Sequence, residues 1–478
     1  MQRLSNEDSF RLIMPSEKRR LALLKGEAGA KYFDDNRHFL AAILATDLRS
    51  IFHIITLKDT DEMFVYTTET GLYEGLGDKT LRTKIKFVLG NSYSEHNAKA
   101  TINDIKATRY TKREEFTVPI HLIPVENGIL DISKNPVKLI DYSEKFYFTK
   151  KLPVTYNRDA KCPKFLKFLN EILPLEKFRL QIQEMFGWCL WRRYSHQVAF
   201  LLIGDGSNGK STLLAVLERL LSKQNIVAVS IQEICNDKFA KADLYQKFAN
   251  IAAETPRKKI EESEDFKKLT DGLTTIRAQK KYGQPFNFIN YAKLIFAANK
   301  VPPSKDRCFA FYRRWNLIFF VVRFGYGGLR KDNNIIDKIT TPEEMSGILN
   351  WSLEGLQRLN KQKEFSERIP EEETKILYER LSNPVATFLT EYIEETDNED
   401  DFISKEYLWK DLLHYCEKNN LPKPKSKKQL SQELRLHFEN IESKQRKVGN
   451  IERARVWINC RYSDDVAKLD YAKWVEEQ

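Results

Sequence analysis

The stretch that most constrains the fold is LLIGDGSNGKST at residues 201–212, where an apolar segment runs into a glycine-rich turn. The helix-forming sequence STLLAVLERLL follows, so a buried strand, a tight turn and an amphipathic helix are predicted in that order. This order is typical of a strand–turn–helix unit in a parallel α/β sheet. Because apolar strands alternate with helical segments from residue 197 to about residue 325, we expect that region to form an α/β core.

The glycine-rich turn fits the pattern GxxxxGK[ST] of a phosphate-binding loop. Glycines permit turns that point successive backbone N–H groups inward, and the helix N-terminus adds partial positive charge. Lys210 can then reach the β- and γ-phosphates, and the hydroxyl of Ser211 can bind Mg²⁺. The alternative is a purely structural turn. The predicted ATP-binding residues are Gly204, Asp205, Gly206, Ser207, Asn208, Gly209, Lys210, Ser211 and Thr212.

Two later strands end in side chains suited to the same chemistry. NIAA leads to Glu254, whose carboxylate can hold Mg²⁺ or polarise the attacking water. KLIFAA leads to Asn299, which can position that water or sense the γ-phosphate. The alternatives are a solvated glutamate at a strand end and a turn residue before Val301-Pro302-Pro303. The order of the two strands after the loop favours the catalytic interpretation.

Arg313 and Arg314, in DRCFAFYRRWNLIFF, directly precede another apolar strand. A guanidinium group is always charged and forked, which suits stabilisation of a γ-phosphate. If a neighbouring subunit supplied it, hydrolysis would depend on assembly. The alternative is an arginine pair in ion pairs or on a solvated helix end, and the sequence does not decide which arginine would act.

The ordered set GDGSNGKST, NIAAETP, FKKLTDGLTTIRAQKKYGQPFNFINYAKLIFAAN and FYRRW resembles the superfamily 3 helicases. It is most similar to the helicase part of the phage/plasmid-type and poxvirus-type primase-helicases. The similarity extends upstream through VENGILDI and QEMFGWCLWR and covers roughly residues 50–330, with weaker similarity to the end. The resemblance implies an AAA+-type ATPase that forms a ring, usually a hexamer, and moves along single-stranded DNA, typically 3′ to 5′, during replication of viruses and plasmids.

By matching position, the resemblance assigns Lys210 and Ser211 to the phosphate loop, Glu254 to the second acidic motif and Asn299 to the first sensor. Arg313 and Arg314 fall where the family's arginine finger lies. Two departures are present. Many relatives have a further acid where this chain has Ala253, so metal contact would rest on Ser211, Glu254 and water. The following motif reads KKLTDGLTT, which shifts Asp271 and leaves its role open.

The segment TTIRAQKKYGQPFNFINY is predicted to form a β-hairpin around Gly283-Gln284-Pro285. Lysines at a hairpin tip can contact phosphates without reading sequence, and an aromatic ring can stack on a base. The resemblance places this hairpin in the channel of the ring, where it would contact single-stranded DNA. A lysine-rich surface turn is the alternative. The predicted DNA contacts are Arg277, Lys280, Lys281 and Tyr282.

The C-terminal part reads as a winged helix, with three amphipathic helices followed by the basic hairpin SKQRKVGNIERARVWINC. Its proposed turn is Gly449-Asn450, and its predicted DNA contacts are Lys444, Arg446, Lys447, Arg453 and Arg455. The alternative is a solvated domain that contacts other subunits or partners.

We therefore expect an α/β fold with an AAA+-type P-loop core, a mixed α/β and helical N-terminal region and a C-terminal winged-helix-like domain. The N-terminal region offers no buried Asp-x-Asp pair of the kind that polymerase chemistry needs, so priming is expected to be done by another protein. The expected domains are a structural or oligomerising region at 1–155, a helical layer at 156–196, the ATPase at 197–345, a helical segment and linker at 346–383, and the DNA-binding domain at 384–478.

Composition narrows the partners and the compartment. The net charge of +11 favours polyanions, and the six scattered cysteines predict neither a zinc site nor a disulfide framework. No apolar run is long enough for a membrane span, and the charged start does not read as a signal peptide, so we expect an intracellular protein that acts on single-stranded or forked DNA with ATP and Mg²⁺. The alternatives are an origin-binding initiator with little unwinding, and a P-loop motor acting on RNA or packaging DNA.

Overall fold

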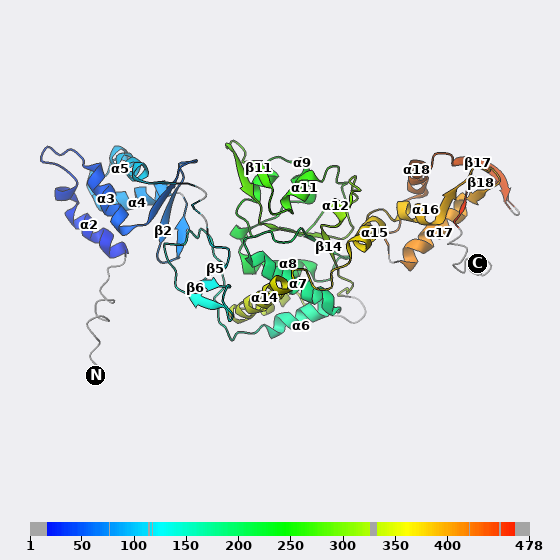
Figure 1. Ribbon diagram of the computed structural model, residues 1–478, viewed down its shortest axis with the longest axis horizontal. Coiled ribbons are helices and arrows are strands. Elements are labelled where there is room, and N and C mark those ends of the chain that lie inside the picture. The colour runs from blue at the N-terminus through cyan, green and yellow to red at the C-terminus, as the bar shows by residue number, and fades with distance from the viewer. Residues whose placement is uncertain are drawn as a thin grey trace. The chain divides into compact units, whose positions relative to one another are not determined.

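The computed structural model describes residues 17–75, 77–112, 115–116, 118–325, 332–419, 421–448 and 451–463. It divides into two compact units between Asn157 and Arg158, coloured blue to cyan and cyan to red in Figure 1. Within the described residues, no helix combines the length and the apolar character that a membrane crossing requires. All six cysteines are free thiols.

The first unit combines helices with two small sheets, as the mixed pattern of its sequence predicts. One sheet has the order β3-β2-β1-β4, in which β1 pairs antiparallel with β2 and parallel with β4. The other is a β5-β6-β7 meander whose first turn is the two-residue loop Glu126–Asn127. The elements are α2 (Glu17–Lys31), α3 (Ala41–Ile51), β1 (Ile54–Leu57), β2 (Met63–Thr67), β3 (Leu72–Glu74), α4 (Gly77–Leu89), α5 (Glu95–Thr108), β4 (Tyr110–Thr111), β5 (Leu122–Val125), β6 (Gly128–Asp131) and β7 (Lys138–Ile140).

The second unit is built on a five-stranded sheet of order β14-β8-β13-β10-β9, in which every neighbouring pair is parallel. The strands are continuous apolar runs, as expected for a sheet covered on both faces. Its strands are β8 (Ala199–Ile203), β9 (Ile226–Val227), β10 (Ala249–Ala252), β13 (Lys293–Ala298) and β14 (Trp315–Phe319). Its helices from 210 to 339 are α8 (Lys210–Leu221), α9 (Ile231–Asn236), α10 (Ala240–Asp243), α11 (Glu264–Leu269), α12 (Phe309–Tyr312) and α13 (Ile335–Ile339).

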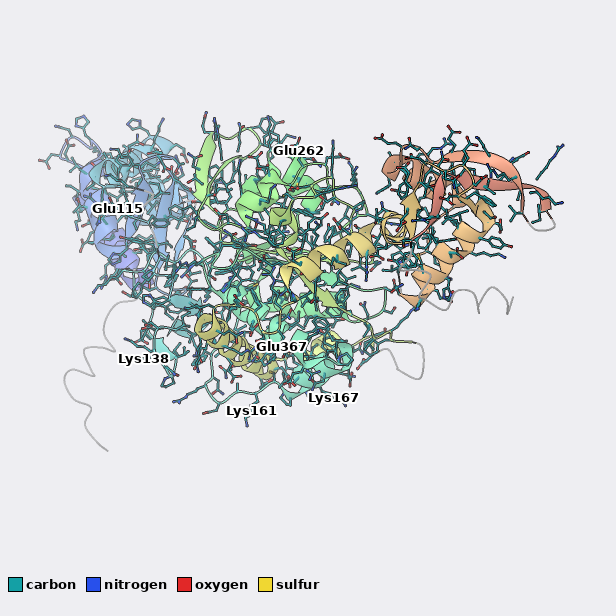
Figure 2. All side chains as sticks on the ribbon, turned by 45° about the vertical axis from the view of Figure 1, so that its right-hand side comes forward. Glu115, Lys138, Lys161, Lys167, Glu262 and Glu367 are labelled. Carbon is teal, nitrogen blue, oxygen red and sulfur yellow. The ribbon has the colours of Figure 1, made fainter. Side chains whose placement is uncertain are left out.

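A helical layer formed by α6 (Pro163–Ile172), α7 (Glu176–Leu190) and α14 (Pro342–Gln362) accompanies this sheet (Figure 1). Helix α6 is strongly amphipathic: Phe165 and Phe168 are buried, whereas Lys167 points outward (Figure 2). The periodicity of residues 163–195 predicts α6 and α7, and the structure confirms both helices.

Within 346–383, where a helical segment and a linker are expected, a second helix follows α14. Residues 371–382 form helix α15 (Glu371–Ser382), which packs on the sheet core. Its Tyr378 is fully buried, stacks against Trp315 with ring centroids 5.8 Å apart, and donates a 2.8 Å hydrogen bond to the carbonyl of Pro302. Leu377 and Leu381 of the same helix also pack on this core, while Glu372 and Glu373 are exposed.

Among its described residues, the C-terminal part contains three helices and a three-stranded antiparallel sheet of order β16-β18-β17. A separate pair, β15 and β19, closes the domain near its start and end. The predicted basic hairpin is present as β17 and β18, although its proposed turn Gly449-Asn450 lies outside the described residues. The elements are α16 (Pro384–Tyr392), β15 (Ile393–Glu395), β16 (Phe402–Ser404), α17 (Lys405–Lys418), α18 (Lys427–His437), β17 (Glu442–Val448), β18 (Ile451–Ile458) and β19 (Cys460–Tyr462).

Candidate nucleotide site and nucleic-acid interface

The phosphate loop lies at the carboxyl ends of three adjacent parallel strands. Ile203 at the end of β8 pairs with Ala298 at the end of β13, and β13 pairs in turn with β10. The amide of Gly204 donates to the carbonyl of Ala298, and the amide of Thr255 donates to the carbonyl of Ala297. These bonds bring Glu254 and Asn299 to the same edge of the sheet as the loop.

The loop, Glu254 and Asn299 line one cavity of about 470 Å³. The predicted loop residues from Gly206 to Thr212 all contribute to its wall. The structure therefore brings together three predicted features that are separated by about 45 residues each in the sequence. The size of the cavity is in the range that a nucleotide-sized ligand requires.

Gly209 shows why the loop needs glycine. Its φ is +86°, and a Cβ at this position would come within 2.5 Å of Cγ2 of Ile172 on α6. Any L side chain would thus be both strained and sterically blocked. The packing of α6 against the loop holds the turn at the N-terminus of α8.

Lys210 is folded into the loop. Its Nζ donates to the carbonyls of Gly204 and Asp205 and to Oδ1 of Asn208, the last two at 3.2 Å. Burial lowers the pKa of Lys210 to about 8, and the nearby charge of Asp205 only partly opposes this. An anionic group in the cavity would restore the usual preference for the charged ammonium.

The oxygen donors of Ser211 and Glu254 line the same cavity, and both residues are exposed to it. The described residues contain no group of three or more histidine, cysteine or acidic side chains that could hold a metal. A hydroxyl and one carboxylate suit Mg²⁺ that is bound together with phosphates and water. Ala253, which directly precedes Glu254, also lines this cavity.

Five further residues line the cavity that the sequence motifs did not predict. Phe168 and Glu171 come from α6, and Phe324, Asp332 and Ile335 follow β14. The amide of Phe324 donates to the carbonyl of Ser207, which fixes it against the loop. Because these residues are distant in sequence and carry no local pattern, only the tertiary fold identifies them. The rings of Phe168 and Phe324 and the apolar side chain of Ile335 suit a base or ribose.

The two arginines lie at the opposite edge of the sheet. The carbonyl of Arg314 accepts from the amide of Ala199 at the start of β8, whereas the phosphate loop follows the end of β8. Five residues at about 3.3 Å each separate the two edges by about 16 Å. Neither arginine is therefore placed to reach the nucleotide cavity of its own chain.

The structure separates the roles of the two arginines. Arg314 is buried, with Nε donating to Oγ1 of Thr270 at 2.9 Å and Nη1 to the carbonyl of Ala310 at 2.6 Å. Arg313 is half-buried and lines a second cavity of about 480 Å³. Arg313 is therefore the better candidate for the predicted arginine finger, because hydrogen bonds hold the side chain of Arg314 inside the core.

The predicted hairpin is confirmed. Strands β11 (Thr275–Gln279) and β12 (Pro285–Ile289) pair antiparallel in the register Gln279↔Pro285 (Figure 1). Ile276 and Phe288 face the core, and Arg277 is exposed on the other face. At the tip, Lys280 and Lys281 are exposed, and Tyr282 is 95% exposed with a φ of +62°.

The basic residues of the C-terminal hairpin fall into two groups. Lys444 and Arg446 form ion pairs with Glu399 and Asp400 at 3.0 and 3.1 Å. By contrast, the ion pairs among the described residues include none of the other three predicted contacts, which are Lys447, Arg453 and Arg455. The pairing of Lys444 and Arg446 was not visible in the sequence, because their partners lie about 45 residues away.

Three family models match separate parts of the chain. Residues 27–174 match "D5 N terminal like", residues 202–314 match a family of unknown function (DUF5906), and residues 380–468 match "Poxvirus D5 protein-like". The chain is 23% identical over 326 residues to a putative helicase, L207/L206, of Acanthamoeba polyphaga mimivirus. That match covers 63% of this chain and 33% of the viral protein, so the chain spans about a third of this relative's length.

Among solved structures, the NrS-1 C-terminal region (residues 305–718) in an apo form covers 88% of this chain and 99% of its own, at 11% identity and a TM-score of 0.43. JCV helicase, solved with a thiazolopyridine compound, covers 42% of this chain and 65% of its own, at 12% identity and a TM-score of 0.21.

Proposed function

Because this chain belongs to the poxvirus D5-like primase-helicase family, we propose that it is an ATP-dependent DNA helicase that acts in replication. The proposal rests mainly on the cavity that unites the phosphate loop with Glu254 and Asn299. A loop alone would bind a nucleotide, whereas a carboxylate and an amide at its edge supply groups that can activate and position water.

In the proposed mechanism, Gly206 to Thr212 hold the phosphates of ATP, and Lys210 contacts the β- and γ-phosphates. Ser211 and Glu254 would bind Mg²⁺, which neutralises charge on the phosphates. Glu254 also polarises the attacking water, and Asn299 orients it. These roles need no large movement, because the residues already line one cavity.

We infer that the subunits form a ring of AAA+ type, with the superfamily 3 arrangement and a hexamer as the expected form. The sheet order β14-β8-β13-β10-β9, with the phosphate loop after β8, supports this assignment. The position of Arg313 gives a physical reason for assembly into a ring. Because Arg313 lies about 16 Å from the cavity of its own chain, it can act as a finger only in the site of a neighbouring subunit.

The hairpin is the proposed contact to single-stranded DNA. Lys280 and Lys281 would contact phosphates, Tyr282 would stack on a base, and Arg277 would extend the positive surface along one face. Tyr282 at the tip supports a binding role. Its ring is 95% exposed and its φ is positive, so the residue adds no buried contact that would stabilise the folded chain.

For the C-terminal domain we propose a winged helix that binds DNA. Its order of α16, β16, α17, α18 and the β17–β18 hairpin supports this fold. Lys447, Arg453 and Arg455 are the stronger candidate contacts, because Glu399 and Asp400 already neutralise Lys444 and Arg446. If this domain recognises a duplex sequence and the protein unwinds little, an origin-binding initiator becomes the better description.

The test is ATP hydrolysis and unwinding of a forked DNA duplex by the wild type and by Lys210→Ala. We expect hydrolysis that single-stranded DNA stimulates, unwinding by the wild type, and loss of both activities by at least about 100-fold in the variant. Stimulation by RNA but not by DNA would favour a motor on RNA. Hydrolysis without any unwinding would favour the initiator.

A further inference from the structure

A chain of hydrogen bonds connects Arg313 to the base of the β11–β12 hairpin. Nη2 of Arg313 donates to Oε1 of Gln197 at 2.6 Å, and Nε2 of Gln197 donates to Oδ1 of Asp271 at 2.7 Å. Oδ2 of Asp271 accepts from Oγ1 of Thr274 at 2.5 Å. Thr274 directly precedes β11, so the connection ends where the hairpin begins.

We propose that Gln197 and Asp271 are positioning residues that couple the nucleotide state of a neighbouring subunit to the DNA-contacting hairpin. This rests on the proposed function, in which Arg313 reaches a neighbour's γ-phosphate. When Arg313 turns toward that phosphate, Oε1 of Gln197 loses its donor, and the Asp271–Thr274 contact at the hairpin base loses its support. The role of Asp271, which the shifted KKLTDGLTT motif leaves open, is thereby assigned.

As long as position 271 carries a carboxylate, the side chain at 197 must be an amide for this connection. Its oxygen accepts from the cationic Arg313 while its nitrogen donates to the anionic Asp271, which a carboxylate or an ammonium cannot do. None of the ion pairs among the described residues includes Arg313, although Glu364 and Glu371 line the same cavity.

The turn that carries Asp271, next to the base of the hairpin, is held firmly by its neighbours. Gly272 has a φ of +74°, and a Cβ there would come within 2.1 Å of the carbonyl oxygen of Tyr194. The turn that carries Asp271 is therefore pressed against the segment that leads to Gln197. The buried side chain of Arg314 holds the same turn through its 2.9 Å bond to Thr270. Arg314 fixes the turn, and Arg313 is the side chain that can move.

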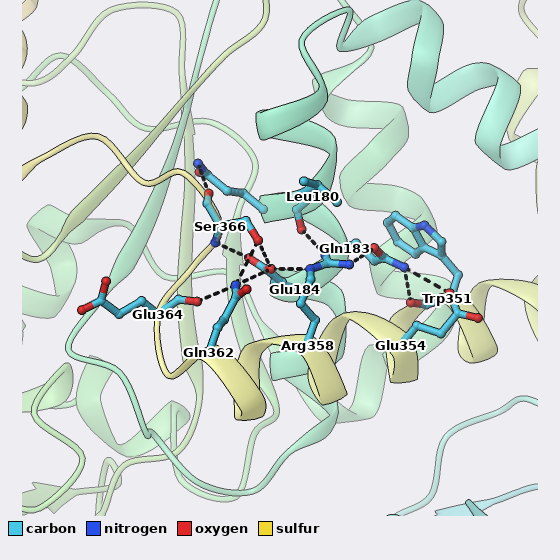
Figure 3. Close-up of polar contacts among 10 residues, drawn as sticks. Leu180, Gln183, Glu184, Trp351, Glu354, Arg358, Gln362, Glu364 and Ser366 are labelled. Atoms are coloured by element: carbon cyan, nitrogen blue, oxygen red, sulfur yellow. Dashed lines mark hydrogen bonds and ion pairs between the residues drawn. The ribbon is translucent and has the colours of Figure 1, made fainter. Parts of the chain in front are cut away.

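The backbone under Arg313 is held from the other side. Nη2 of Arg368 donates to the carbonyls of Arg313 and Trp315. Glu184, which is fully buried, anchors the segment before Arg368 (Figure 3). Its carboxylate accepts from Nε of Arg358 at 2.7 Å and from the amide of Ser366 at 2.8 Å. With the backbone fixed, the cavity of about 480 Å³ around Gln197 and Arg313 gives room for the side chain alone to change partners.

Exchanging the amide of residue 197 with the carboxylate of residue 271 tests the hydrogen-bond connection without removing it. Gln197→Glu alone places two carboxylates against each other and breaks the bond to Asp271. In the double variant Gln197→Glu/Asp271→Asn, the new carboxylate accepts from Arg313 and from the new amide, and the amide oxygen accepts from Thr274. All three hydrogen bonds can then form again. The matched control is Gln224→Glu, which makes the same charge change at an exposed site.

The readout is the factor by which single-stranded DNA stimulates ATP hydrolysis, measured with the full chain for each variant. We expect Gln197→Glu to reduce this factor by about fivefold or more, and the double variant and the control to stay within about twofold of wild type. Wild-type stimulation in Gln197→Glu, or its loss in the double variant as well, would overturn the coupling role alone. A wild type without DNA-stimulated hydrolysis would overturn the proposed function, and the coupling with it.

Discussion

Lys210 and Gly209 illustrate how the phosphate loop follows from local chemistry. The glycine is required because its backbone is left-handed and Ile172 lies against the place a Cβ would occupy. The lysine is retracted among the loop's own oxygens, so its charge is costly until an anion arrives. The short pattern GxxxxGK[ST] predicted the glycine turn and the lysine, whereas the contact with Ile172 and the retracted position of the lysine come from the structure alone.

The depressed pKa of Lys210, about 8, predicts a pH dependence of nucleotide binding. Because a phosphate favours the charged ammonium of Lys210, nucleotide binding should raise the pKa of Lys210. Above a pH of about 8, binding would therefore be accompanied by uptake of a proton at Lys210. The affinity for a non-hydrolysable ATP analogue should be constant below about pH 8 and fall by up to about tenfold per pH unit above it. Isothermal titration calorimetry would measure this, with Lys210→Arg as the control that stays charged. The same pH profile for both proteins would contradict the assignment to Lys210.

At the scale of elements, hydrophobic periodicity predicted α6, α7, α8 and the β11–β12 hairpin, because each buries a repeating face. It failed for α15, since Tyr378 is the one fully buried aromatic side chain of that helix and many charged residues surround it. The walls of the nucleotide cavity beyond the loop also escaped prediction. Phe168 and Phe324 are brought to the loop by tertiary packing, and no local pattern marks them.

The anchoring of α15 predicts a large effect of Tyr378→Ala on stability. The change removes a fully buried ring and its bond to Pro302, so unfolding free energy should fall by about 3 kcal/mol or more. Urea unfolding would measure it, with Ile376→Ala as the control on the same helix. Ile376 is 48% exposed, and its variant should stay within about 0.5 kcal/mol of wild type. Equal effects at the two positions would mean that α15 does not anchor the core through Tyr378.

At the scale of the whole molecule, candidate functional residues lie at both ends of the strands of the parallel sheet. Its carboxyl edge holds the nucleotide cavity, and its amino edge holds Arg313, Gln197 and the base of the hairpin. Under the proposed function, a single subunit would carry half of one ATPase site and half of another. The sequence predicted the order of the motifs, but the division between edges depends on strand pairing.

This division predicts complementation between inactive subunits. Lys210→Ala removes the phosphate contact and Arg313→Ala removes the finger, so each variant alone should hydrolyse ATP at least about 100-fold more slowly than wild type. In mixed rings, some sites would combine an intact loop with an intact Arg313 from the neighbour. Hydrolysis by the mixture should therefore exceed the sum of the separate variants. Strict additivity would show that Arg313 does not act between subunits.

The measurement that most directly tests the central claim, that ATP hydrolysis drives the hairpin along DNA, is the number of base pairs unwound per ATP hydrolysed. Lys281→Ala, at the exposed hairpin tip, would be compared with Lys223→Ala, which removes an exposed lysine elsewhere. The account predicts basal hydrolysis within about twofold of wild type in both variants and unwinding reduced by about tenfold or more only in Lys281→Ala. Unwinding at the wild-type yield in Lys281→Ala would contradict the role of the hairpin.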